Sequence, residues 1–248
     1  LLLDRESKII HKDSYITEDK PNIDFKFRGK LPPNLLNTIY PIQKNSYALS
    51  DFTKHFFIED KNWEYNSTSP FSWIRSQKAG GKSLLWGRQT YRMSELDFKN
   101  WPISYEDLEP WYDKVEKFIG VSGKKEGLEI VPDGIFQPPF PLNSIERYVK
   151  TQLKQNFTDI ILTNGRCAHL TAPTDEQLKL GRMSCIKKNQ CERGCSRAAY
   201  YSAESSSTKA ARNTGNLTEM YDFVVSKINF ESGSNKVASM TVIDKKTK

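Results

Sequence analysis

The chain has 248 residues, of which 37% are hydrophobic and 12% aromatic, and it carries a net charge of +7. These proportions exclude an intrinsically disordered chain and indicate a folded protein with a buried core. No apolar run approaches the roughly 18 residues that a membrane-spanning helix needs, and four cysteines are too few for a disulfide-rich secreted scaffold.

The positive charge is spread along the chain rather than gathered in one stripe. Dense basic runs are short, as at Lys187-Lys188 and around Lys245 at the carboxyl end. A solvated basic surface is the simplest interpretation. The alternative is a non-catalytic basic module that binds nucleic acid or carbohydrate, because aromatic and basic residues alternate in places. The neighbouring pairs are Trp73 with Arg75, Trp86 with Arg88, and Tyr91 with Arg92.

The first seventy residues predict little regular structure. Leu1-Leu2-Leu3 followed by Asp4 indicates the end of a buried strand that meets an acidic residue. Residues 5–70 are polar, and prolines such as Pro21, Pro32 and Pro41 interrupt any long helix. We therefore expect a strand end within 1–10 and a loop-rich covering segment over 11–70.

A glycine-rich turn follows this covering segment. Residues 71–75 predict a short strand, and Ala79 to Ser83 predict a tight turn. Gly80 and Gly81 let the backbone bend sharply and approach a planar or phosphorylated ligand, since no Cβ is in the way. Exposed amides in such a bend can bind an anion. Taken alone, a Gly-Gly-x-Ser sequence is more often an ordinary turn.

Two helices are predicted in the middle of the chain. Ser104 is a suitable N-cap for the first, whose apolar residues recur at helical spacing until Gly120 ends it. Asn143 with Glu146 three residues later is a capping-box pattern for the second helix. The apolar run at 160–162 predicts a strand after that helix.

The carboxyl-terminal part predicts one helix and a hairpin. The helix covers about 205–211 and ends near Gly215. Two strands, at 217–230 and 237–243, flank a turn at 232–235. The order of elements is therefore mixed α and β, with the strongest hairpin signal at the end of the chain.

Several of these segments form one ordered series. The series begins with Gly80-Gly81-Lys82-Ser83-Leu84-Leu85-Trp86-Gly87-Arg88 and continues through Arg92, Asp97-Phe98, residues 101–112 and residues 119–123. Cys191-Glu192-Arg193-Gly194-Cys195 and Thr214-Gly215-Asn216-Leu217-Thr218 follow later. This series resembles the glucose-methanol-choline oxidoreductase family, in particular its bacterial sugar-dehydrogenase and pyranose-oxidase-like members. The resemblance runs along the whole chain and is strongest over 71–123 and 185–228.

The resemblance implies a set of FAD-binding residues. Asp4 matches the acidic residue that binds the adenosine ribose, a task that suits a carboxylate because it accepts two hydrogen bonds from a vicinal diol. Val225 matches a position whose backbone contacts the adenine. The segment that wraps the pyrophosphate and flavin ring is matched by Gly80, Gly81, Ser83, Leu84, Trp86 and Gly87. Asp4 could instead be a solvated strand end, although its position and context favour the ribose role, and Trp86 could be ordinary core.

The sequence also departs from that family. Pyranose oxidases carry a histidine bonded covalently to the flavin where this chain has Leu85, so we expect non-covalent FAD. The Gly-x-Gly-x-x-Gly fingerprint and the family's late catalytic histidine are absent from the 248 residues. None of the three histidines, His11, His55 and His169, fits the catalytic position. We therefore predict no catalytic residue in this chain, little bound FAD after purification and no activity alone.

The spacing of the cysteine and histidine residues favours structural roles over metal binding. Cys185, Cys191 and Cys195 lack the Cys-x2-Cys spacing of common zinc sites, and His169 near Cys167 is more often a partly buried polar residue. Structural thiols, or one disulfide if the protein is exported, are the simpler interpretation. We predict no metal site.

By the resemblance, the expected fold is α/β: an incomplete Rossmann-like FAD domain plus part of a substrate-binding or cap domain. The FAD domain would take 1–10, 71–100 and 205–248, and the cap or substrate side 101–204. The expected function is a fragment of an FAD-dependent oxidoreductase acting on CH–OH groups of sugars or related alcohols, with an unassigned electron acceptor. No nucleic-acid partner and no membrane span are expected, and the compartment is left open.

Overall fold

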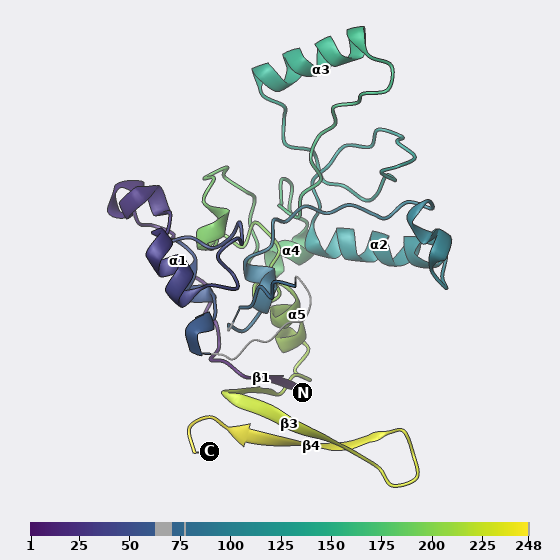
Figure 1. Ribbon diagram of the computed structural model, residues 1–248. Coiled ribbons are helices and arrows are strands. Elements are labelled where there is room, and N and C mark those ends of the chain that lie inside the picture. The colour runs from purple at the N-terminus through teal and green to yellow at the C-terminus, as the bar shows by residue number, and fades with distance from the viewer. Residues whose placement is uncertain (63–70, 77, 248) are drawn as a thin grey trace. The chain divides into compact units, whose positions relative to one another are not determined.

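The computed structural model describes residues 1–62, 71–76 and 78–247, so part of the predicted covering segment, 63–70, lies outside the described residues. The described chain mixes helices with small sheets and is a mixed α/β structure (Figure 1). The α-helices are α1 (Pro33–Ile39), α2 (Tyr105–Ile119), α3 (Ser144–Asn156), α4 (Asp175–Lys179) and α5 (Ser207–Asn213). The strands are β1 (Leu2–Asp4), β2 (Glu219–Tyr221), β3 (Phe223–Phe230) and β4 (Val237–Asp244).

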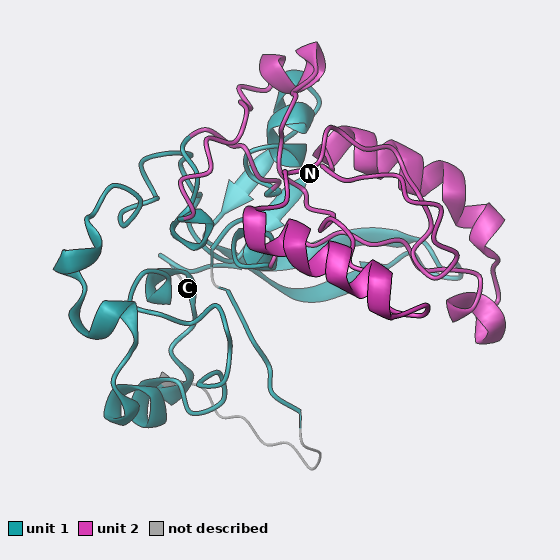
Figure 2. Ribbon diagram, turned by 90° about the horizontal axis from the view of Figure 1, so that it is seen from above, with its two compact units in different colours: residues 1–86, 190–196, 202–248 teal, residues 87–189, 197–201 magenta. Residues whose placement is uncertain are grey.

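The chain divides into two compact units, coloured separately in Figure 2. Unit 1 comprises residues 1–86, 190–196 and 202–248, and unit 2 comprises residues 87–189 and 197–201. Unit 1 therefore brings both ends of the sequence into one body.

In unit 1, β1 and β2 form a short parallel pair, with Leu2 opposite Glu219 and Asp4 opposite Tyr221. The Leu2 amide donates to the Thr218 carbonyl at 2.8 Å. A parallel pair needs a long crossover connection, and here that connection is most of the sequence. The predicted strand is confirmed as Leu2–Asp4, but its predicted full burial is wrong, because all three residues are half-buried and Leu1 is 70% exposed.

β3 and β4 form the predicted antiparallel hairpin, with Val225 opposite Val242 and Ile228 opposite Met240. The predicted single strand over 217–230 is wrong, because Asp222 has a φ of +66° and separates β2 from β3. A left-handed residue cannot continue a strand, so the chain changes direction there. The predicted third helix is present two residues later than expected, as α5.

The core of unit 1 is built mainly by the first ninety residues. Its buried members are Ile9, Tyr15, Leu31, Tyr40, Phe56, Phe57, Ala79, Leu84 and Leu85. Leu84 and Leu85 come from the glycine-rich segment, so that segment is anchored in the core rather than lying loose on the surface. The predicted strand at 71–75 is wrong, because no strand is formed by these residues, and the Arg75 side chain binds buried Asp60 at 3.2 Å.

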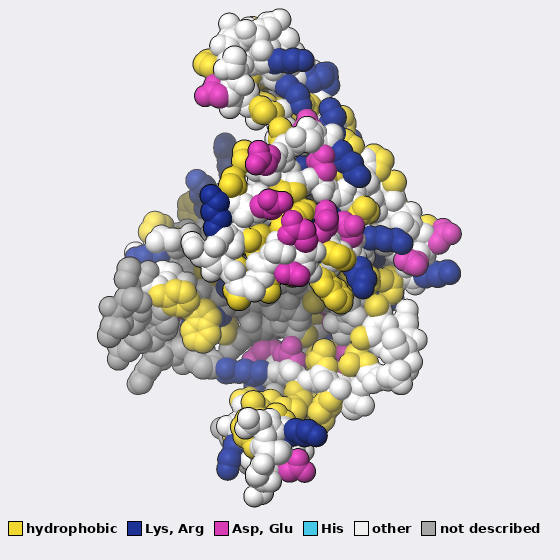
Figure 3. Space-filling model, turned by 90° about the vertical axis from the view of Figure 1, so that its right-hand side faces the viewer, with side chains coloured by type: hydrophobic (Ala, Val, Ile, Leu, Met, Phe, Trp, Pro, Cys, Tyr) yellow, Lys and Arg dark blue, Asp and Glu magenta, His cyan; other side chains and the backbone are white. Residues whose placement is uncertain are grey.

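In unit 2, α2 has the caps that the sequence predicts. Ser104 and Asp107 form a reciprocal capping box, and Gly120 ends the helix with a φ of +76°. The acidic first turn is exposed, and Figure 3 shows acidic side chains gathered on the face where α2 lies. Buried Arg92 ties the helix down by binding Glu116 through Nε at 3.0 Å and Nη2 at 2.6 Å.

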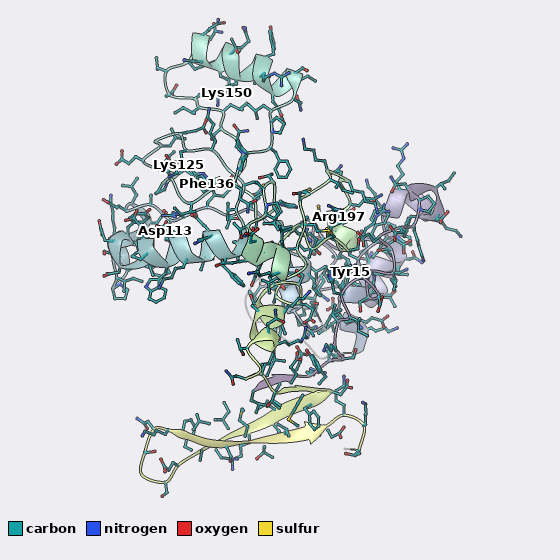
Figure 4. The ribbon with its side chains drawn as sticks, turned by 180° about the vertical axis from the view of Figure 1, so that it is seen from behind. Tyr15, Asp113, Lys125, Phe136, Lys150 and Arg197 are labelled. Carbon is teal, nitrogen blue, oxygen red and sulfur yellow. The ribbon has the colours of Figure 1, made fainter. Side chains whose placement is uncertain are left out.

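α3 also begins at the predicted capping box, formed by Asn143 and Glu146. Its apolar stripe is exposed rather than buried: Ile145 is 74% exposed and Val149 is 38% exposed. Lys150 lies on the side of α3 nearer the segment of Lys125 (Figure 4), and its Nζ is 3.0 Å from Glu126 Oε1. The predicted strand at 160–162 is wrong, because these residues pair with no strand among those described.

Candidate functional site

The double-glycine turn, which we define as residues 80–84, adopts the sharp bend that its sequence indicates. Gly80 has a φ of +91° and Gly81 a φ of +51°, in the region that favours glycine. A 3₁₀ turn follows at Gly81–Leu84. The Gly81 amide donates to the Lys78 carbonyl at 2.8 Å, and the Ser83 amide to the Gly80 carbonyl at 3.1 Å. The turn is therefore held by its own backbone.

The outer side of the double-glycine turn is open. A Cβ placed on Gly81 would meet no other atom within 4 Å. The Lys82 amide reaches no acceptor in residues 1–62, 71–76 and 78–247, so it is a donor available to a ligand. An open backbone surface with a spare amide is the kind of cradle that a planar or phosphorylated group can contact closely.

The inner side of the double-glycine turn is fixed. Leu84 is 1% exposed and packs into the core of unit 1. Ser83 Oγ donates to the Gly80 carbonyl at 2.5 Å and accepts from the Ala203 amide at 2.9 Å. The Ser83 hydroxyl is therefore occupied in shaping the turn and in joining it to the segment that precedes α5.

Asp4 lies at the carboxyl end of β1, which is half-buried. Its Oδ1 accepts a hydrogen bond from the Glu6 amide at 2.9 Å, which orients the carboxylate at the strand end. The carboxyl end of a parallel strand is where ligands bind in open α/β sheets. The ribose-binding role that the resemblance implies for Asp4 stays a prediction.

A network of charged side chains lies between the double-glycine turn and β1, the strand that carries Asp4. Glu204 directly follows Ala203, whose amide donates to Ser83 Oγ of the turn at 2.9 Å. Arg212 of α5 then binds Glu204 at 2.8 Å. It also binds Glu219 of β2 through two nitrogens, at 2.8 and 2.7 Å. Since β2 pairs with β1, the network runs from the turn to the strand that carries Asp4.

The pKa values of the two carboxyl groups in this network shift in opposite directions, because Glu219 is dominated by its ion pair and Glu204 by its burial. The hydrogen bonds from Arg212 lower the pKa of Glu219 to about 2, and those with Glu219 raise the pKa of Arg212. Burial raises the pKa of Glu204, against the opposing pull of Arg212. Burial also raises the pKa of Tyr221 to about 12. Glu219 is thus firmly ionised at neutral pH.

The remaining predicted residues are less closely associated with the turn. Trp86 is half-buried, and its amide donates to the Lys82 carbonyl at 2.9 Å. Val225 lies on β3 beside a bulge and is 41% exposed. Gly87 is the first residue of unit 2, so the structure does not relate it to the rest of the site.

Sequence reasoning missed Glu204, Arg212, Glu219 and Tyr221. Arg212 lies eight residues after Glu204 and seven before Glu219, so neither partner shows the helical i,i+4 spacing that flags an ion pair. The pairs arise from tertiary packing of three segments. No local pattern in the sequence marks these pairs.

The arginines of the aromatic–basic pairs that suggested a nucleic-acid or carbohydrate module are buried, whereas Trp73 and Tyr91 are 47% and 51% exposed. Arg75, Arg88 and Arg92 are 9%, 6% and 4% exposed. Arg75 binds Asp60, and the Arg88 guanidinium lies 4.0 Å from the centre of the Tyr200 ring. These arginines therefore form no exposed basic stripe.

Histidine and cysteine side chains are dispersed. His55 and His169 are neutral at physiological pH, since burial lowers the pKa of each to about 4. His11 Nε2 is 3.0 Å from the Ser196 carbonyl. All four cysteines are free, and in the described part of the chain no group of three metal-ligating side chains comes together.

Comparison with known proteins gives one informative relative. Over 148 residues the chain is 27% identical to the fructose dehydrogenase large subunit of Gluconobacter japonicus. The match covers 54% of this chain and 26% of that protein, so it spans about a quarter of the relative's length. No family model matches the chain. Among the described residues, no helix is both long enough and apolar enough to cross a membrane.

Proposed function

We propose that this chain forms part of the flavin-binding region of an FAD-dependent oxidoreductase that acts on CH–OH groups of sugars or related alcohols. The observation that carries the proposal is the open double-glycine turn, tied within one unit to the strand that ends in Asp4. The relationship to a protein named fructose dehydrogenase supports the substrate class. The proposal also follows the family resemblance of residues 80–88.

The residues present fit FAD bound without a covalent link. Bound FAD would supply the hydride acceptor for oxidation of an alcohol carbon. The Asp4 carboxylate would accept hydrogen bonds from the ribose hydroxyls, and the Lys82 amide would donate to a phosphate or ring oxygen. Leu85 is 5% exposed and packs in the core, so its side chain offers no attachment point.

No residue of this chain is assigned to proton abstraction. His55 and His169 are half-buried, and His11 is committed to Ser196 and Tyr15. A general base must come within hydrogen-bond reach of the substrate hydroxyl, and we assign that role to none of the three rings. The contribution proposed for this chain is therefore to bind and orient the cofactor.

The proposal is tested by titrating FAD into the purified 248-residue chain and following quenching of flavin fluorescence. We expect saturable but weak binding, because the sequence has no Gly-x-Gly-x-x-Gly run to place a helix amino terminus against the pyrophosphate. Asp4→Asn should weaken binding, whereas Asp24→Asn, an exposed change elsewhere in unit 1, should not. Quenching that never saturates, or equal affinities for both variants, would contradict the proposal.

A further inference from the structure

Arg212 occupies a central place in unit 1. It belongs to α5, and its side chain is 26% exposed. Its guanidinium binds carboxylates from two other segments, Glu204 before the helix and Glu219 on β2. It also donates to the Tyr221 hydroxyl at 3.2 Å. The planar fork of arginine suits this bridging role, because its nitrogens can bind several oxygens in fixed directions.

One arm of this bridge ends at the double-glycine turn. Glu204 is 4% exposed, and its neighbour Ala203 donates its amide to Ser83 Oγ at 2.9 Å. The segment just before α5 is therefore hydrogen-bonded to the turn next to the residue that binds Arg212.

The other arm ends at β1. Glu219 stands opposite Leu2 and Tyr221 opposite Asp4 in the parallel pair. Tyr221 also donates its hydroxyl to Glu219 Oε1 at 2.6 Å, and Lys8 Nζ is 3.8 Å from the same carboxylate. Both ends of β2 are thus connected to Arg212, and β2 in turn sets the position of Asp4.

We propose that Arg212 is a positioning residue that fixes the spacing between the double-glycine turn and Asp4, so that one dinucleotide can reach both. The inference rests on the proposed function, and it adds the residue that couples the two half-sites. A ligand that bridges two half-sites gains affinity from their fixed spacing, whereas a ligand confined to one half-site does not. Arg212 does not contact the ligand in this proposal; it fixes the distance between the double-glycine turn and Asp4.

The test compares a bridging ligand with its two halves on the full chain. FAD, AMP and FMN are titrated into the unmodified protein, Arg212→Gln and Glu204→Gln, with ligand-observed NMR for the weak half-ligands. We expect both variants to weaken FAD binding by roughly tenfold or more, while the affinities for AMP and FMN stay within about twofold of those of the unmodified protein. Arg28→Gln, which removes an exposed charge from the same unit, should change none of the three.

Glu204→Gln keeps the size of the side chain, so it carries the test if Arg212→Gln fails to fold, as circular dichroism will reveal. Equal losses of affinity for FAD, AMP and FMN would overturn the inference, since that pattern indicates general damage to the fold. Unchanged FAD affinity in a folded variant would overturn it as well. Failure of the unmodified chain to bind FAD would instead overturn the proposed function, and the inference with it.

Discussion

Arg212 of α5 and Glu219 of β2 form a two-pronged ion pair, in which Nε donates to Oε2 at 2.8 Å and Nη2 donates to Oε1 at 2.7 Å. β2 is only three residues long, so backbone pairing with β1 does little to hold it alone. The ion pair fixes β2 to the helix that precedes it. This small arrangement connects the strand that carries Asp4 to the rest of unit 1.

The pair predicts how stability depends on pH. In the folded chain the pKa of Glu219 is about 2, below its ordinary value of 4.5. The unfolded chain therefore takes up this proton first as the pH falls, and the stability from Glu219 is present above pH 4.5 and lost toward pH 2. Urea unfolding of the unmodified chain and Glu219→Gln should differ at pH 6 and converge near pH 2.

The stability contribution of Glu204 should have the opposite pH dependence, which makes Glu204→Gln a control for this experiment. Burial raises its pKa, so stability from its protonated form is present below the unfolded value and lost as the pH rises through the folded value. The difference between the unmodified chain and Glu204→Gln should therefore change with pH in the opposite direction. A Glu219→Gln difference that stays constant between pH 6 and pH 2 would contradict the account.

The two glycines of the turn predict different effects on binding. Both have positive φ, so Gly80→Ala and Gly81→Ala should each lower the free energy of unfolding by about 1–2 kcal/mol. A methyl on Gly80 would lie inward, 3.5 Å from Ser83 Oγ, whereas a methyl on Gly81 would project into open space. Only Gly81→Ala should weaken FAD binding beyond what its stability loss explains.

These two variants act as controls for each other, because their backbone strain is similar. Unfolding is followed by circular dichroism in urea, and FAD affinity by flavin fluorescence on the folded protein. Equal effects of both substitutions on FAD affinity would show that the open side of the turn is not a ligand surface.

The structure also shows which signals the sequence carries. Both long helices were predictable because their start signals are local: Ser104 is a good N-cap for α2, and the capping box of α3 is a contact between residues three apart, Asn143 and Glu146. The break at Asp222 was not, because a non-glycine residue at positive φ has no reliable local signature. The apolar run at 160–162 resembles a strand, but a strand also needs a partner, which tertiary structure alone supplies.

The same distinction applies to the candidate site. The turn was predictable because two adjacent glycines mark a special backbone conformation. Its connection to β1 was not, because Glu204, Arg212 and Glu219 meet only after three segments pack together. The turn itself can therefore be predicted from the sequence, whereas the ion pairs that connect it to β1 cannot.

Unit 2 offers a stability prediction that is independent of any ligand. Arg92 binds Asp113 and Glu116 and is 4% exposed, while Glu116 is itself 4% exposed. Arg92→Met would leave the Glu116 carboxylate buried without its partner, which costs about 3–5 kcal/mol. Urea unfolding should show this loss, and Arg147→Met on exposed α3 should stay within about 0.5 kcal/mol of the unmodified chain.

Amide chemical shifts of the nitrogen-15-labelled chain during FAD addition test the central claim most directly, because they report where the ligand lies. The account predicts that the largest saturable changes fall on two segments, Gly80–Ser83 and Asp4–Glu6, with little change in α3. Changes confined to other segments, or no saturable change at the double-glycine turn, would contradict it.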